Sequence, residues 1–304
     1  MPWLTTALDS FSSRKSWAYR PGDDPAAEST ALCALALLGH ERSSESIAAL
    51  EMLTTMQLPS GAVTPHAGEQ SPHWSTAFAV LAWTYAMKKN AGDDAARRRY
   101  AIAASSGCDF LLSIRGETIN PADNPHIGHN TLLVGWPWIE GTHSWTEPTA
   151  LAYLALKATG RRNNPRAIEA AALLIDRLLP DGGCNHGNTM VLGQMLLPHA
   201  MPTGLVMLAL GGGETDGDPR IEKSLKYLEN ERHETEAAAS LGYALLGLAA
   251  HGRLPADADA RIETSLARPS VEVGAVGTRR PLLALAALGE RSPLVEMTRE
   301  GMRG

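Results

Sequence analysis

The chain has 304 residues, 44% of them hydrophobic and 5% aromatic, and a formal net charge of −6 at pH 7. Because it carries no basic stripe to neutralise a phosphate backbone, we expect no binding of nucleic acid. The three cysteines are too scattered for a disulfide framework, and no run of 18 uncharged apolar residues predicts a transmembrane segment. We therefore expect a cytoplasmic protein, with peripheral attachment to a membrane as a further option.

Two kinds of helix alternate along the chain. Amphipathic stretches with one charged face predict outer helices at residues 3–13, 44–57, 95–114, 165–179, 218–231 and 256–267. The second kind is apolar on nearly all sides, which predicts helices that are buried all round. Each of these opens with a short repeated motif. In chain order the six openings are Ser29-Thr30-Ala31-Leu32, Ser75-Thr76-Ala77-Phe78, Pro148-Thr149-Ala150-Leu151, Pro202-Thr203-Gly204-Leu205, Ala238-Ala239-Ser240-Leu241 and Arg280-Pro281-Leu282-Leu283.

This alternation predicts an all-α fold, an (α/α)6 toroid of about six inner and six outer helices. An open solenoid would need polar capping repeats at its ends, and the sequence shows none. We expect one domain over residues 1–304, with an insertion at about 116–142 before the third inner helix. All inner helices should begin at the same mouth of the ring, so the residues that precede the openings should converge there.

A degenerate sequence motif at the ends of two outer helices indicates a family resemblance. It has the form Leu53-x-x-x-Gln57-x-x-x-Gly61 and Leu174-x-x-x-Leu178-x-x-x-Gly182, and inner helices that open Pro-Thr-Ala-Leu follow. The pattern, over roughly residues 27–290, resembles the repeats of the terpenoid cyclase and protein prenyltransferase superfamily. The resemblance implies an enzyme that acts on an isoprenoid or other apolar substrate in the central cavity. The Asp-x-Asp-Asp motif of class II cyclases and the Asp-x-Cys pair of prenyltransferases are both absent.

Unusual residues gather before the inner helices. We expect the catalytic groups to come from Glu147, Asp181 and His143, because a carboxyl group buried there can act as a general acid or base. Trp rings at the rim can cover a prenyl chain or stabilise a carbocation. The expected substrate-binding residues are Trp74, Trp136, Trp138, Trp145, His73, Asn185, Asn188 and Glu236.

A metal site is the alternative chemistry at the same rim. His143, Cys184, His186 and His199 are all ligand types that a tetrahedral zinc ion accepts, although their spacing matches no standard zinc motif. The sequence therefore leaves two possibilities open, an enzyme without a cofactor and one with Zn²⁺.

Structural roles compete with these readings. Glu147 before Pro148 also suits a helix start, Asp181-Gly182-Gly183 is a turn signal, and the Trp residues can seal the ring. The function alternatives are a non-catalytic toroid that binds a lipid or a peptide, and a subunit whose protein partner supplies the chemistry. Arg279-Arg280 is a further candidate for holding a diphosphate.

Overall fold

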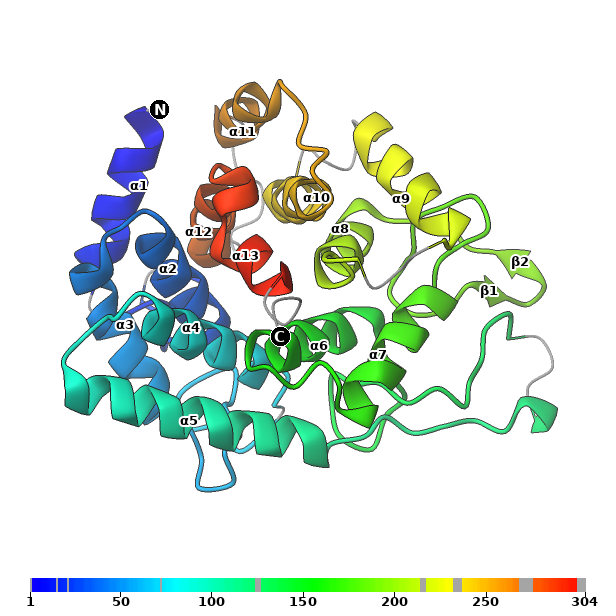
Figure 1. Ribbon diagram of the computed structural model, residues 1–304, viewed down its shortest axis with the longest axis horizontal. Coiled ribbons are helices and arrows are strands. Elements are labelled where there is room, and N and C mark those ends of the chain that lie inside the picture. Colours follow the sequence, from blue (N-terminus) through cyan, green and yellow to red (C-terminus); the bar gives the residue numbers. More distant parts are fainter. Residues whose placement is uncertain are drawn as a thin grey trace.

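The computed structural model describes residues 2–14, 16–20, 22–71, 73–123, 127–213, 217–231, 237–267 and 276–299. Within them, two concentric layers of helices form an all-α (α/α)6 toroid (Figure 1). The outer helices are α1 (Pro2–Ser12), α3 (Ser43–Thr55), α5 (Asp94–Ser113), α7 (Pro165–Asp176), α9 (Pro219–Asn230) and α11 (Ala258–Ala267). The inner helices are α2 (Ala27–Gly39), α4 (Thr76–Lys88), α6 (Thr146–Ala158), α8 (Ala200–Ala209), α10 (Ala238–Ala250) and α12 (Val276–Ala286). The predicted fold class is confirmed.

The start of the last inner helix differs from the prediction. The motif at Arg280-Pro281 was expected to open this helix, but α12 begins at Val276 and contains Pro281 in its interior. A proline there cannot donate to the carbonyl four residues earlier, which belongs to Gly277. The Ser29 hydroxyl of α2 donates to that carbonyl oxygen instead, at 2.9 Å. The bond supplies the missing donor and closes the ring between the last and first inner helices.

The repeated threonines explain why the opening motif recurs. The hydroxyl groups of Thr76, Thr149 and Thr203 each accept a hydrogen bond of 2.9 Å from a backbone N–H in the loop that precedes their own helix. Gln57, the glutamine retained in the degenerate motif, donates to the carbonyl oxygens of Gly61 and Ala103. These contacts pin the loops at the mouth of the ring to the helices behind them.

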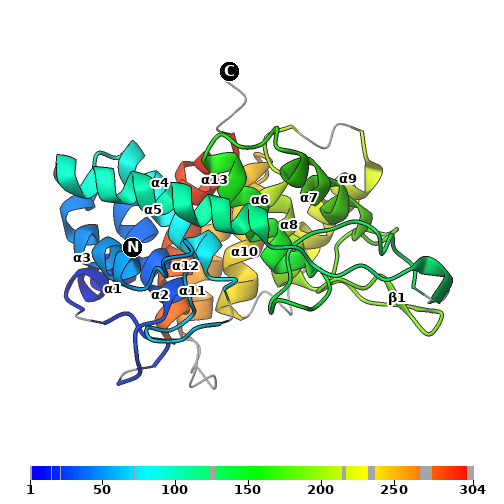
Figure 2. The same cartoon turned by 90° about the horizontal axis from the view of Figure 1, so that it is seen from below.

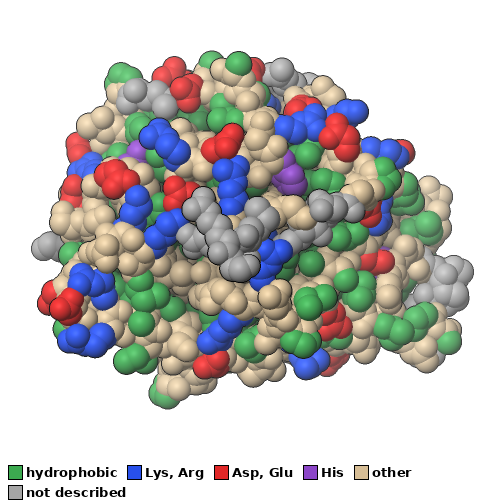
Figure 3. Space-filling view, in the orientation of Figure 1, with side chains coloured by type: hydrophobic (Ala, Val, Ile, Leu, Met, Phe, Trp, Pro, Cys, Tyr) green, Lys and Arg blue, Asp and Glu red, His purple; other side chains and the backbone are tan. Residues whose placement is uncertain are grey.

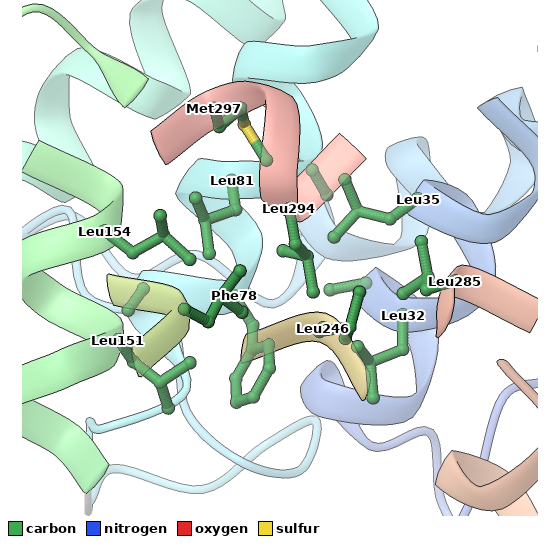
Figure 4. Packing of buried hydrophobic residues seen from close by; sticks show 14 of the residues in the cluster. Leu32, Leu35, Phe78, Leu81, Leu151, Leu154, Leu246, Leu285, Leu294 and Met297 are labelled. Carbon is green, nitrogen blue, oxygen red and sulfur yellow. The ribbon is translucent and has the colours of Figure 1, made fainter. Parts of the chain in front are cut away.

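Side chains fill the axis of the ring. Leucines and one phenylalanine from the inner helices meet there (Figure 4) and are almost completely buried: Leu32, Leu35, Phe78, Leu81, Leu151, Leu154, Leu246 and Leu285. A short helix that the sequence analysis did not predict, α13 (Pro293–Arg299), adds Leu294 and Met297 to the same cluster. The expectation of an apolar cavity along the axis is therefore wrong for the described residues, because long leucine side chains and α13 occupy that space.

The inner helices run parallel, so the ring has two different ends. Their C-terminal ends are joined by polar side chains: the Lys157 Nζ of α6 donates to Ala209 O and Gly211 O, and the imidazoles of His40 and His251 lie 3.0 and 2.9 Å from carbonyl oxygens of neighbouring inner helices. Helix α13 lies over this end (Figures 1 and 2). The N-terminal ends form the other, open mouth.

Two long connections extend beside the ring. The chain between α5 and α6 contains the 3₁₀ turn η1 (Pro121–Asp123), and the chain between α7 and α8 forms an antiparallel hairpin of β1 (Met190–Val191) and β2 (Gln194–Met195). Both project from the same side of the molecule (Figures 1 and 2). A second 3₁₀ turn, η3 (Gly289–Arg291), leads from α12 into α13. No described helix is long and apolar enough to cross a membrane.

Candidate functional site at the open mouth

The repeat places chemically different residues at equivalent positions of the mouth. The residue directly before the opening motif is Glu28 in α2, Trp74 before α4 and Glu147 in α6. Both glutamates lie in the first turn of an inner helix, where the helix dipole favours a negative charge. The toroid therefore brings two carboxyl groups and an indole ring to one end of the ring.

Glu147 forms a close pair with a histidine from the next repeat. Its Oε1 contacts Nδ1 of His186, while the carboxyl side chain is only 3% exposed and the imidazole is 50% exposed. Backbone contacts fix this geometry, because Thr146 N donates to His186 O at 3.0 Å. The second carboxyl oxygen, Oε2, is buried, and no group of the described residues is its hydrogen-bond partner. The pair thus joins a shielded carboxylate to a histidine that faces solvent.

A second histidine lies beside this pair. The rings of His186 and His199 are 5.6 Å apart between centroids. Asn185 directly precedes His186, and its Oδ1 accepts from Gly187 N at 3.1 Å. Its Nδ2 is buried without a hydrogen-bond partner among the described residues. Unpartnered buried polar atoms are rare in folded proteins and mark places where a ligand or water can complete the hydrogen bonding.

An aromatic pocket lies on the α4 side of the mouth. Trp74 and Trp138 pack edge to face with ring centroids 5.2 Å apart, and a hydrogen bond of 2.6 Å links His73 Nδ1 to Glu140 Oε1. The pocket lining is apolar apart from His73 and Glu140, and the cavity volume is about 10 Å³, space for roughly one water molecule. The apolar residues that line the pocket are Trp74, Ala77, Leu111, Ile114, Trp136, Pro137, Trp138 and Pro148. Since Pro148 follows Glu147, this pocket and the Glu147–His186 pair adjoin.

Glu28 marks the opposite side of the mouth. The Tyr19 hydroxyl donates to Glu28 Oε2 at 2.8 Å, and burial raises the pKa of this carboxyl group. Burial, followed by the nearby Glu28 charge, also raises the pKa of Tyr19 and of Tyr243 from α10. A carboxyl group with a raised pKa can hold a proton and donate it.

A larger cavity, with a volume of about 300 Å³, borders Tyr19, the hydrogen-bond partner of Glu28. Its lining includes Arg14 and Arg20, whose guanidinium groups suit an anionic part of a ligand, together with the acidic residue Asp23. Arg279, the arginine that the sequence suggested for this role, instead donates to Ser265 O between α11 and α12.

The remaining predicted site residues have different environments. Trp136 is 2% exposed and donates from Nε1 to Leu111 O at 2.8 Å, so it borders the pocket from within the core. Trp145 is half-buried and stacks at 4.7 Å on the exposed His143 ring. Asn188 is exposed, and Glu236 lies outside the described residues.

Asp181 corrects one expectation. It was expected to be a buried acid, but its side chain is fully exposed beside Lys223. The cause is the following Gly182-Gly183 pair, in which both residues have positive φ and turn the chain outward. The turn explanation that the sequence also offered describes Asp181 correctly.

The proposed zinc ligands are not assembled. Among the described residues, no three His, Cys, Asp or Glu side chains come together in a way that could hold a metal ion. Cys184 is completely buried, its side chain is hydrogen-bonded to Thr203, and burial raises the pKa of its thiol. The Thr203 contacts that pin this loop keep the sulfur in the core, away from the exposed His143.

Sequence reasoning missed Glu28 and Tyr19. The repeat held the signal for Glu28, because Glu28-Ser29-Thr30-Ala31 and Glu147-Pro148-Thr149-Ala150 align without a gap. Tyr19 lies in the connection between α1 and α2, where no periodic pattern could indicate its contact with Glu28.

Comparisons with known proteins bear on the fold alone. No family model matches the chain, and a search of curated proteins finds no relative. Among solved structures, a reducing-end-xylose-releasing exo-oligoxylanase is similar, both as two single-residue mutants and in complex with xylose. In each case the TM-score is 0.55 and the identity 14%, over 90% of this chain and 83% of the other. The toroid is shared, whereas terpenoid cyclase or prenyltransferase activity stays a prediction.

Proposed function

We propose that the protein is an enzyme that transfers protons to or from an apolar, isoprenoid-like substrate bound at the open mouth of the toroid. The observation that carries this proposal is the pair of Glu147 and His186, a buried carboxylate in contact with a half-exposed imidazole. An arrangement of this kind orients a histidine ring, which prepares it for general acid–base catalysis.

The roles of the two side chains differ from those that the sequence suggested. With Nδ1–H directed at the Glu147 carboxylate, the Nε2 atom of His186 carries the lone pair that accepts a proton from the substrate or from water. Glu147 is too buried to meet a substrate and acts as the positioning residue. Glu28, whose pKa is raised by burial, is the proposed proton donor on the opposite side of the mouth.

The lining of the mouth supports an apolar substrate. The lining of the Trp74–Trp138 pocket includes Ala77, Leu111 and Ile114, whose apolar surface suits an apolar group of a substrate. His73 and Glu140 are the polar residues of the same lining. Because the axis is filled, the substrate would lie across the mouth and not deep inside the ring. No cofactor is needed for proton transfer by these groups.

A carbohydrate is the second candidate substrate. Enzymes that cleave glycosidic bonds also use two carboxyl groups in different environments, together with Trp rings at the rim of the site. The fold shared with the exo-oligoxylanase adds to this candidate, although 14% identity does not carry an activity across.

The test measures turnover with defined probes. Purified protein is incubated with squalene, farnesyl diphosphate and xylo-oligosaccharides, and products are detected by mass spectrometry. For any probe that turns over, His186→Gln is expected to reduce kcat about 100-fold or more, and Glu147→Gln by a smaller factor. Asp181→Asn, at an exposed turn, is the matched control and should retain full kcat.

Two outcomes would contradict the proposal. Full turnover by His186→Gln would remove the histidine from the chemistry. A ligand that binds tightly without turnover, with an affinity unchanged in Glu147→Gln, would instead support the alternative of a non-catalytic binding toroid.

A further inference from the structure

An apolar hairpin beside the mouth contributes no residue to the buried hydrophobic cluster of the described residues. Residues 189–198, called the hairpin finger below, contain strands β1 and β2 and project from the ring between α7 and α8 (Figure 2). Four large apolar side chains of the finger face solvent: Val191 is 41% exposed, Met195 49%, Leu197 77% and Leu192 85%. We propose that the hairpin finger inserts into the surface of a lipid layer.

The composition of the finger suits an apolar medium. From Thr189 to Pro198 no residue carries an ionisable side chain. Part of its backbone is paired within itself, through the β1–β2 ladder and the hydrogen bond of 3.0 Å from Leu196 N to Thr189 O. Both features lower the cost of moving the segment from water to the surface of a lipid layer, where charges and unpaired backbone groups are costly.

The turn at the tip holds a leucine in an unfavourable conformation. Leu192 has φ = 50° and is followed by Gly193 with φ = 77°. At the first of two such positions a hairpin normally uses Asn, Asp or Gly, because a Cβ atom crowds the backbone there. A leucine at this position weakens the fold while its side chain stays 85% exposed, so its apolar surface is available for a contact outside the chain.

The size of the finger favours lipid over a protein. A stable protein interface buries about 800 Å² on each partner, far more than four side chains on a two-stranded ribbon provide. Hydrophobic side chains gather at the edge of the molecule where the hairpin lies (Figure 3). Insertion into lipid needs only the apolar tips, and its strength follows the apolar area removed from water.

The finger is continuous with the candidate site. His186 lies three residues before Thr189, and His199 follows Pro198 directly. Gly128 packs closely on the base of the finger, since a Cβ atom on Gly128 would lie 2.8 Å from Met190 Cβ. An inserted finger would hold the His186 side of the mouth against the lipid surface, from which a lipid substrate can enter; this last step rests on the proposed function.

The test is flotation with phosphatidylcholine vesicles. Wild-type protein should float with the vesicles, and the binding should persist in 0.5 M NaCl because the finger carries no charge. The double variant Leu192→Asn/Leu197→Ser should reduce the partition coefficient about tenfold or more. Asn suits the positive φ at position 192, so this variant should keep its fold, which circular dichroism checks.

A matched control variant separates the finger from general surface hydrophobicity. Ile102→Ser/Ile168→Ser removes two exposed apolar side chains from the outer helices α5 and α7, where they are 68% and 59% exposed. Its partitioning should stay within about twofold of wild type. His186→Gln should float like wild type, so a failure of the proposed chemistry and a failure of lipid binding give different results.

Three results would overturn the inference. The first is that the wild type does not float with the vesicles. The second is that the finger variant and the control variant lose binding equally. The third is that the wild type does not bind vesicles but forms a dimer in light scattering, which only the finger variant loses. The last result would identify a second copy of the chain as the occupant of the finger.

Discussion

Lys157 allows a quantitative prediction at the closed end of the toroid. Its side chain is completely buried, and Nζ donates to Ala209 O at 3.0 Å and to Gly211 O at 2.7 Å. Burial, with a smaller effect of Arg162, lowers the pKa of Lys157 from 10.5 to about 7. Between these two values the unfolded chain binds a proton that the folded chain does not, so the free energy of unfolding rises with pH.

The magnitude follows from linkage. Each pH unit in this window adds about 1.4 kcal/mol to the stability of the wild type, or roughly 3 kcal/mol between pH 7 and pH 9.5. Lys157→Met lacks this dependence and also leaves two carbonyl oxygens without their donor, at about 1–3 kcal/mol each. We expect the variant to be less stable than wild type at pH 9.5, with a deficit that shrinks as the pH falls toward 7.

Urea denaturation at pH 7, 8, 9 and 9.5 measures this difference directly, because groups that titrate in both proteins cancel. Lys226→Met is the control, since Lys226 lies on α9 with its side chain 62% exposed. The reasoning is refuted if the difference between wild type and Lys157→Met is the same at every pH.

Three further predictions concern stability and turnover. Gly204→Ala should lower the free energy of unfolding by about 3 kcal/mol or more in urea denaturation, because the new Cβ would lie 2.4 Å from the Tyr243 carbonyl where α8 and α10 cross; a smaller loss would mean that these helices can separate. Leu192→Asn alone should raise the melting temperature, by relief of about 1 kcal/mol at a positive φ, and a lower melting temperature would contradict strain at the tip. Asp181→Asn should change stability by less than about 0.5 kcal/mol, and a larger loss in thermal denaturation would show that the Lys223 contact matters.

Periodicity predicted most of the fold. Charged faces and all-round apolar stretches distinguish outer from inner helices because each layer has a different environment. Helix α13 was missed because seven residues are too few for a periodic signal, and only the finished ring supplies the surface on which α13 packs. The early start of α12 was missed because Pro281 reads as a helix opening, and the Ser29 contact that permits it comes from the other end of the chain.

The site was predicted less well, because it depends on the direction of side chains in loops. The sequence indicated Glu147 and His186 as mouth residues, but their contact arises from the loop register that Thr203 and Thr146 fix. The same register buries Cys184, which the zinc hypothesis required to be accessible. The residue types near the mouth of the ring indicate where chemistry can occur. The hydrogen-bond partners and the burial of each side chain decide which groups take part.

Closure of the ring between α12 and α2 has a consequence for synthesis on the ribosome. The side of α2 that meets Gly277 and Ala284 has no partner until almost the whole chain has been made. An open solenoid can fold repeat by repeat as it emerges, but a closed ring keeps an apolar edge uncovered until its last inner helix arrives. We therefore expect nascent chains that stop before residue 276 to bind chaperones, and release to follow the emergence of α12.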